Sequence, residues 1–231
     1  MSKVKSYAAL QADKPLHPHD INRRDINPDD VNIDILYCGV CHSDIHMARN
    51  EWNNTSIYPM VPGHEIIGIV KEVGSSVTKF KVGDNVGVGV YVDACEKCDN
   101  CNSGKDHYCE EGIVLTYNSY EYGTRNITYG GYSKRIVVKE NYVIKVPSEM
   151  DMKKAAPLLC AGITTYSPLR HFKINSNHKV GIAGLGGLGH MGLKFASSFG
   201  ADVVVFSTSD SKKDEAFEMG ANHFVNVNNS K

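Results

Sequence analysis

The chain has 231 residues, of which 42% are hydrophobic and 22% are charged, and its formal net charge is -1. This length is sufficient for one large or two small domains, each with its own core. The near-neutral charge gives no electrostatic basis for binding nucleic acid or an anionic membrane surface, and no apolar stretch is long enough to span a bilayer.

The N-terminal part of the chain, to residue 147, alternates short β-rich runs with glycine turns. Its first residues lack the apolar core of a secretory signal, so we expect a cytoplasmic protein. We expect a compact, mostly antiparallel β domain with irregular loops. The clearest strand candidates are residues 31–37, 66–73, 85–91, 133–138 and 142–146.

Three side chains in this part and just after it have the chemistry of a catalytic zinc site: Cys41, His64 and Cys160. Such a site needs three protein ligands and one open position. Two thiolates and an imidazole suit zinc. Taken singly, each residue has a simpler interpretation, namely a buried cysteine, a turn histidine and a core cysteine.

Four further cysteines are grouped at C-x2-C-x2-C-x7-C spacing in a polar lobe of about residues 93–111. Because the chain has seven cysteines and no secretory signal, metal binding explains the group better than disulfides do. Four thiolates would close the coordination sphere of a structural zinc. An iron–sulfur cluster is the alternative, but the bacterial spacing ends in C-x3-C-P, so zinc is favoured. The ligands are Cys95, Cys98, Cys101 and Cys109.

The pattern changes after residue 147, where helices are expected over 152–160 and over 162–172, the second with Pro168 as a kink or break. A strand–helix–strand–helix–strand series follows, which is typical of a parallel sheet with right-handed crossovers. We therefore expect a Rossmann-type domain over residues 148–231. Because a complete domain of this type has about six strands, we expect it to be truncated at its C-terminus. Its strands are expected at 179–183, 201–206 and 223–227, and its helices through about 199 and at 211–219.

A glycine-rich loop, GLGGLG at 184–189, links the first of these strands to its helix, which is the context of a dinucleotide-binding loop. Gly184 permits the tight turn, Gly186 lets the backbone approach a pyrophosphate, and Gly189 allows close packing of helix and strand. The helix N-terminus adds free N–H donors and a partial positive charge.

The end of the second strand bears on the choice of nicotinamide cofactor. An NAD site usually has Asp or Glu there, whereas this strand ends in hydroxyl residues followed by lysine. Hydroxyls and an ammonium group can bind the 2′-phosphate of NADP(H). The alternative is a solvated helix cap with exposed lysines, and the nearby Asp210 argues against a phosphate. The candidates are Ser207, Thr208, Ser209 and Lys212.

Three motifs carry a family resemblance: CHSD at 41–44, YPMVPGHE at 58–65 and LLCAGIT at 158–164. With them the chain resembles zinc-dependent alcohol dehydrogenases of the medium-chain dehydrogenase/reductase superfamily, and most of all the cinnamyl alcohol dehydrogenase branch. The resemblance runs from about residue 30 to the last residue. It implies a GroES-like catalytic domain over 1–147 and an NADP-binding Rossmann domain over 148–231.

The resemblance also implies roles for individual residues. Zinc would act as a Lewis acid on the substrate oxygen. Ser43 would begin a proton relay that His46 completes toward solvent. Asp44 would orient a metal ligand, and Glu65 would be an alternative ligand. To the cofactor site the resemblance adds Thr164, Gly187 and Leu188.

The implied function is hydride transfer between NADP(H) and a primary alcohol or aldehyde, aromatic or of medium chain length. It implies two Zn²⁺ per chain, one catalytic and one structural, and an apolar substrate cleft near Trp52, Tyr91 and Leu115. The partner is a small-molecule substrate, without nucleic acid or membrane. A homodimer is expected for full-length members and is doubtful for a truncated chain. The alternatives are a polyol or sugar dehydrogenase and a non-catalytic zinc-binding remnant.

Overall fold

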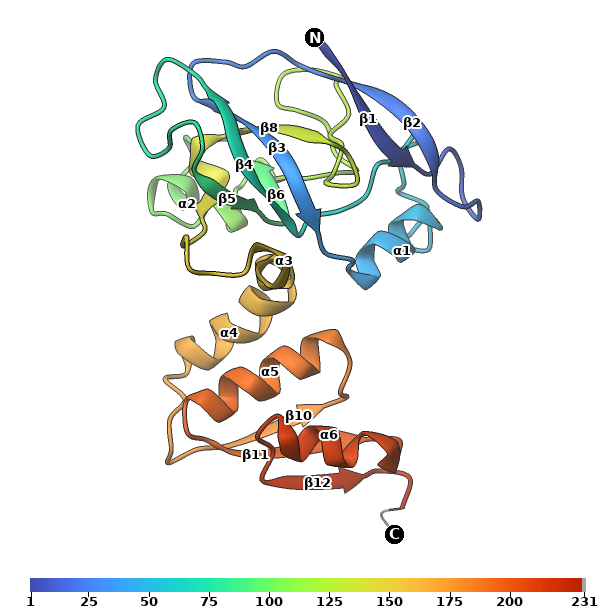
Figure 1. The fold of residues 1–231 in the computed structure, drawn as a ribbon, viewed down its shortest axis with the longest axis vertical. Helices are drawn as coiled ribbons and strands as arrows, with labels where there is room; N and C mark the ends of the chain where they lie inside the picture. Colours follow the sequence, from blue (N-terminus) through green and yellow to red (C-terminus); the bar gives the residue numbers. More distant parts are fainter. Residues whose placement is uncertain (230–231) are drawn as a thin grey trace. The chain divides into compact units, whose positions relative to one another are not determined.

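A computed structural model describes residues 1–229 of the chain. The chain divides into two compact units, Met1–Cys160 and the residues from Ala161 onward (Figure 1). The boundary expected after residue 147 falls inside the first unit. Among the described residues, no helix combines the length and the apolar character that crossing a membrane requires.

The first unit is built on a five-stranded antiparallel sheet with strand order β8-β3-β4-β5-β9. The central strands are rich in β-branched residues, which favour extended backbone. Ile33, Ile66 and Val86 from three of them are fully buried in the core that lines one face. The strands are β3 (Asp30–Cys38), β4 (Ile66–Val73), β5 (Asn85–Val88), β8 (Arg135–Lys139) and β9 (Val143–Lys145).

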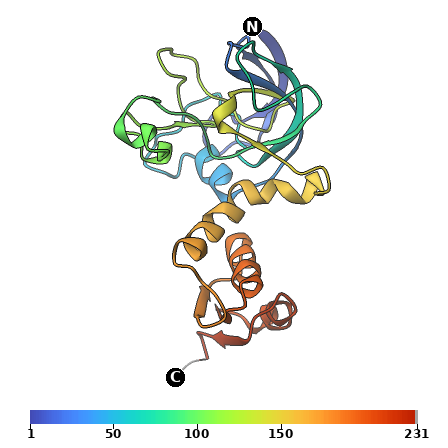
Figure 2. The same cartoon turned by 90° about the vertical axis from the view of Figure 1, so that its left-hand side faces the viewer.

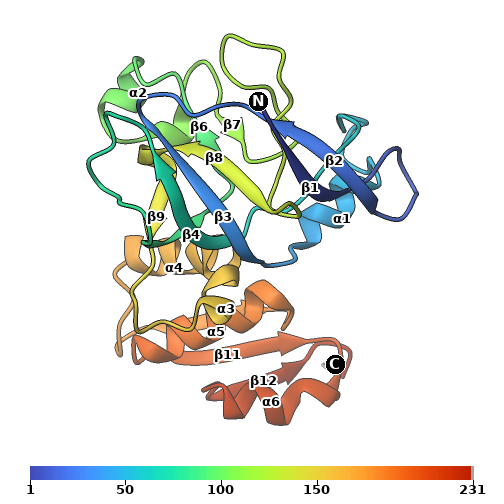
Figure 3. The ribbon, with the colours of Figure 1, turned by 45° about the horizontal axis from the view of Figure 1, so that its top comes forward.

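A hairpin of β1 (Ser2–Ala8) and β2 (His17–Arg23), which the sequence analysis did not predict, joins this sheet beside β8 (Figure 3). Its link to the sheet is an antiparallel bridge between Ser6 and Ser133. Every second residue of β1 is buried, but these positions are Val4, Ser6 and Ala8. Because two of the three buried positions hold a small or a polar residue, the hydropathy of the sequence does not alternate along this strand.

Most of the candidate ligands lie in or at the ends of short elements in this unit. The expected strand 85–91 is instead two strands, β5 and β6, that are interrupted at residues 89–90. Strand β6 pairs with β7 in a separate two-stranded sheet. The elements are α1 (His42–Ala48), β6 (Tyr91–Asp93), α2 (Asp99–Asn102), the 3-10 turn η1 (Asp106–Tyr108), β7 (Val114–Leu115) and the 3-10 turn η2 (Glu140–Tyr142).

The helix expected over 152–160 is a short α3 (Met152–Ala155) that continues as a 3-10 turn, η3 (Ala156–Leu159). Pro157 lies at the start of this turn, and its missing N–H favours the tighter winding. Ala155 and Ala156 pack against Ile67 of the sheet and against Val146. This packing places residues 148–160 in the first unit.

The second unit has a three-stranded parallel sheet of order β10-β11-β12. Two crossover helices, α5 and α6, cover one face of it (Figure 2), as right-handed connections in one direction require. Pro168 lies inside α4 without ending it. The Rossmann-type expectation is confirmed. The elements are α4 (Ala161–His171), β10 (Lys179–Ala183), α5 (Gly187–Ser198), β11 (Asp202–Ser207), the 3-10 turn η4 (Asp210–Lys212), α6 (Lys213–Glu218) and β12 (His223–Asn226).

Candidate metal centres and cofactor-binding loop

The first candidate centre joins three separate segments of the first unit. Cys41 is the N-cap of α1, His64 and Glu65 directly precede β4, and Cys160 follows η3. One possible ligand atom from each of these four residues lies within 4.8 Å of the other three. The three ligands predicted from the sequence are therefore brought together, and Glu65 joins them as a fourth donor.

The donor atoms fit a single tetrahedral ion. The sulfur atoms of Cys41 and Cys160 are 3.8 Å apart. Zinc–sulfur bonds of about 2.3 Å at a tetrahedral angle place two sulfurs about 3.8 Å apart. His64 is 5% exposed, and its buried Nε2 atom has no hydrogen-bond partner. Because an unpaired buried nitrogen is unfavourable, a metal ion is the partner that this arrangement suits.

Burial sets the protonation of these ligands. It lowers the pKa of His64, so the imidazole is neutral and its nitrogen can bind a metal. It raises the pKa of the Cys160 thiol to about 12, and the neighbouring Cys41 acts in the same direction. A divalent cation reverses this preference, because it stabilises the thiolate directly.

The two predicted relay residues lie three positions apart on α1, a spacing that puts side chains on one face of a helix. The Ser43 hydroxyl oxygen lies 3.5 Å from the Cys41 sulfur. The His46 ring bonds through Nδ1 to Glu51, and it stacks on Trp52 with ring centroids 5.2 Å apart. Glu51 was missed in the sequence analysis, although an acid five residues beyond a relay histidine, past a helix end, is within reach of it.

Asp44 is almost fully buried, at 3% exposure, and it bonds the backbone of two of the ligand segments. Its carboxylate accepts bonds from the backbone N–H groups of Cys41 and Gly63, each at 3.0 Å, and from the Tyr132 hydroxyl at 3.0 Å. The expected orienting role thus has a physical route through the backbone of the ligand segments.

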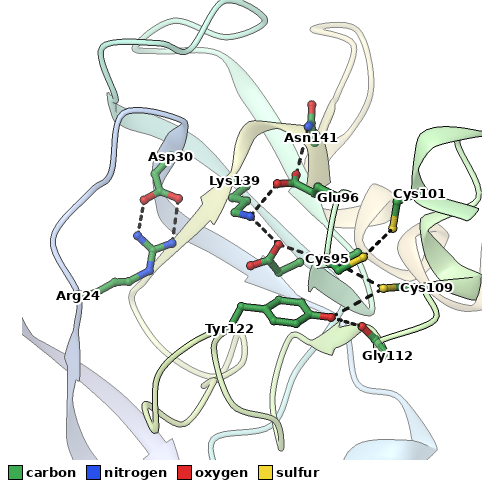
Figure 4. Close-up of polar contacts among 12 residues, drawn as sticks. Arg24, Asp30, Cys95, Glu96, Cys101, Cys109, Gly112, Tyr122, Lys139 and Asn141 are labelled. Carbon is green, nitrogen blue, oxygen red and sulfur yellow. Dashed lines mark hydrogen bonds and ion pairs between the residues drawn. The ribbon is translucent and has the colours of Figure 1, made fainter. Parts of the chain in front are cut away.

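The second candidate centre is the four-cysteine lobe, in which all four sulfur atoms lie within 4.8 Å of one another. The Cys95 and Cys101 sulfurs are 3.8 Å apart, as a single tetrahedral ion requires, and all seven cysteines of the chain are free thiols. Figure 4 shows Cys95, Cys101 and Cys109 gathered beside the Tyr122 hydroxyl. The backbone N–H of Cys95 points at the Cys109 sulfur and lowers the pKa of that thiol to about 6.

A lysine of the main sheet bonds the four-cysteine lobe to that sheet. Lys139 donates to Asp93 at 2.8 Å and to Glu96 at 2.9 Å, and Asn141 also contacts Glu96 (Figure 4). These bonds tie the start of the lobe to β8 and η2. Lys139 carries no motif, so nothing in the sequence marked it.

The three residues expected near a substrate cleft lie in two different places. Tyr91 and Leu115 pair across β6 and β7, and Tyr91 packs edge-on against Tyr142 of the sheet core. Trp52 is 46% exposed and stacks on His46. Of the three, Trp52 lies beside a predicted relay residue.

The glycine loop has the conformation that its sequence requires. Gly184 has φ +82°, a left-handed value that favours glycine. Gly186 is the N-cap of α5, and neither it nor Gly187 has an atom within 4 Å of the position of a Cβ. At Gly189 a Cβ would lie 1.9 Å from the carbonyl oxygen of Gly184. The loop thus combines an open backbone with one tight contact between the first turn of α5 and the residue that follows β10.

This contrast gives a prediction for the second unit. Gly189→Ala is expected to destabilise it by about 1–3 kcal/mol, because the methyl group must displace the loop backbone. Gly187→Ala is the matched control and should be neutral or slightly stabilising, since the site is open. Hydrogen exchange of β10 and α5 measures both. Equal protection in the two variants would contradict the packing role of Gly189.

The residues that were predicted to bind a 2′-phosphate are only partly available to a ligand. Ser207 is buried, and its hydroxyl bonds within the turn to the backbone of Ser209. Ser209 accepts from the N–H of Ser211 and caps η4, as the simpler interpretation expected. Lys212 reaches the glycine loop, where its ammonium donates to the carbonyl of Leu185 at 2.8 Å. The other cofactor candidates, Thr164 on α4, Thr208 after β11 and Leu188 on α5, are exposed.

Comparisons with known proteins agree with this geometry. Residues 27–148, more than half of the chain, match the family model for the alcohol dehydrogenase GroES-like domain. The chain is 53% identical over 226 residues to NADP-dependent alcohol dehydrogenase C 1 of Mycolicibacterium smegmatis, covering 97% of this chain and 64% of that protein.

Two solved structures are also similar. One is a cinnamyl alcohol dehydrogenase from Sorghum bicolor, with a TM-score of 0.94, 44% identity, and coverage of 97% of this chain and 64% of that one. The other is CAD from Helicobacter pylori complexed with NADP(H), with a TM-score of 0.93, 48% identity, and coverage of 99% and 66%.

The chain thus spans about 64% of the length of the relatives that it matches. The family model covers the strands that carry the antiparallel sheet, and the structural match continues through the glycine loop. The chain belongs to the alcohol dehydrogenases with a GroES-like domain, and it is similar to cinnamyl alcohol dehydrogenases.

Proposed function

We propose that the protein is an oxidoreductase that transfers hydride between NADP(H) and a primary alcohol or aldehyde, aromatic or of medium chain length. The observation that carries this proposal is the convergence of Cys41, His64 and Cys160 around the unpartnered His64 Nε2 atom. The relatives named as NADP-dependent alcohol dehydrogenase and cinnamyl alcohol dehydrogenase support the same reaction class.

Cys41, His64 and Cys160 would hold a zinc ion, which when bound supplies Lewis-acid chemistry. Two thiolates and a neutral imidazole leave one coordination position for an oxygen ligand. The Glu65 carboxylate lies within the same group of donor atoms and is the side chain that can take this position when no other ligand does.

The proton that is exchanged in the reaction has a path along α1. Ser43 holds a hydroxyl proton next to the Cys41 sulfur, and His46 lies one helical turn further, toward solvent. Glu51 accepts from the His46 ring and orients it, which suits an imidazole that takes up and releases protons.

The second unit would bind NADP(H), with the glycine loop at the pyrophosphate and Thr208, Ser209 and Lys212 at the 2′-phosphate. The four-cysteine lobe would hold a second, structural zinc, which makes two per chain. Such a set of free thiols suits a reducing, cytoplasmic compartment. The partners would be a small-molecule substrate and, as expected for full-length members of the family, a second copy of the protein.

The test is the turnover of purified, zinc-replete protein with NADPH and cinnamaldehyde, followed by the absorbance of the cofactor. We expect NADPH to be oxidised faster than NADH, and the aldehyde to be reduced faster than a sugar such as xylose. An inactive protein that retains both metals would favour the non-catalytic alternative. Equal rates with the two cofactors would overturn the assignment of the 2′-phosphate residues.

A further inference from the structure

The carboxylate of Asp44 is the point at which the metal-ligand segments of the first unit are joined. One oxygen accepts the Gly63 N–H, next to His64, and the other accepts the N–H of Cys41 itself. Gly63 lies 19 residues beyond Asp44 in the chain. A carboxylate that bonds both backbones fixes the distance between Cys41 and His64.

A third donor, the hydroxyl of Tyr132, comes from a segment that carries no ligand. It bonds the same Asp44 oxygen as Cys41 does, at 3.0 Å. The backbone holds Tyr132 in place, because its N–H donates to Pro62 and its carbonyl accepts from Tyr7. The position of the hydroxyl is therefore built into the fold.

The ring of Tyr132 lies directly against the His64 segment. A Cβ on Gly63 would come within 2.8 Å of the Tyr132 ring, and φ at Gly63 is +103°. On another side, the Tyr117 ring stacks on His64 with centroids 5.6 Å apart, and burial together with the nearby charge of Asp44 raises the pKa of Tyr117. Two neutral tyrosines thus lie near the carboxylate, and Tyr132 is the one whose hydroxyl donates to it.

We infer that Tyr132 is a positioning residue for the first metal centre: through Asp44 it holds the segments of Cys41 and His64 at the spacing that a bound zinc ion needs. This inference rests on the proposed function only for the presence of that zinc. In the described part of the chain, the Tyr132 hydroxyl bonds Asp44 and not the side chains of Cys41, His64 or Cys160, so its effect on these three ligands passes through the carboxylate.

The expected effect follows from the charge on the acceptor. Hydrogen bonds to charged groups are stronger than neutral ones. Loss of an outer partner of a metal ligand commonly weakens metal binding about 10–100-fold. Because Asp44 keeps its two backbone donors when Tyr132 is lost, we expect the lower end of this range.

The experiment compares Tyr132→Phe with Tyr58→Phe. The control also removes a tyrosine hydroxyl bond, from Tyr58 to the carbonyl of Ala48 on α1, without contact to Asp44. We expect a chelator to remove one metal about 10-fold faster from Tyr132→Phe than from wild type, while the second metal is released at the wild-type rate. Tyr58→Phe should release both metals as wild type does.

The double variant Asp44→Asn with Tyr132→Phe tests the route. If Tyr132 acts through Asp44, the double variant loses metal no faster than Asp44→Asn alone. Release at the wild-type rate from Tyr132→Phe, or additive effects in the double variant, would overturn the inference. Neither measurement uses substrate or cofactor, so a protein without turnover can still support the role of Tyr132.

Discussion

Replacement of Cys41 by serine is expected to lower the proposed NADPH-dependent aldehyde reduction by about three orders of magnitude. A neutral hydroxyl is a much weaker zinc ligand than a thiolate, and Lewis-acid stabilisation is worth several kcal/mol, at about 1.4 kcal/mol per factor of ten. We expect the metal content to fall by one ion per chain. Cofactor absorbance measures the rate, and elemental analysis measures the metal.

The matched control is Cys38→Ala. Burial raises the pKa of the Cys38 thiol to about 12, and among the described residues Cys38 belongs to neither cysteine cluster. Both metals and most of the turnover should survive in this variant. Turnover of Cys41→Ser within tenfold of wild type would show that the first centre does not take part in the reaction.

The elements that were predicted well from the sequence are those with a regular local pattern of residue types. Strands β4 and β10 lie at the predicted residues, because β-branched runs flanked by glycine have few other solutions. Helix α1 was missed, since it buries only Asp44 and Met47 and so has no apolar stripe. It begins directly after its N-cap, Cys41, because the Asp44 carboxylate accepts the Cys41 N–H.

The candidate ligands were found because each lies in a short motif, but the groups that support them were not. Tyr132 is 88 residues from Asp44, and Lys139 is 43 residues from Glu96. No local pattern connects such pairs, and only the folded sheet brings them together. Glu51 is a different case, because it lies only five residues from His46, and this short spacing could have predicted the contact.

The four-cysteine lobe is expected to unfold locally when Cys98 is replaced by serine. Neither α2 nor η1 contains a buried residue, and within the described part of the chain the lobe reaches the hydrophobic core only through Ala94 and the packing of Cys101 and Cys109 against it. The ion pairs of Lys139 with Asp93 and Glu96 contribute about 0–1 kcal/mol each at such partly exposed positions. A structural zinc supplies on the order of 10 kcal/mol, so the metal decides the outcome.

Hydrogen exchange separates this local effect from global unfolding. In Cys98→Ser we expect residues 93–111 to lose protection and one metal to be lost, while β3 and β4 stay protected by the buried core around Ile33 and Ile66. Lys139→Met should leave the lobe protected as long as its metal is bound. If Cys98→Ser kept the lobe protected, the ion pairs and backbone bonds would be sufficient, and the metal would not be structural.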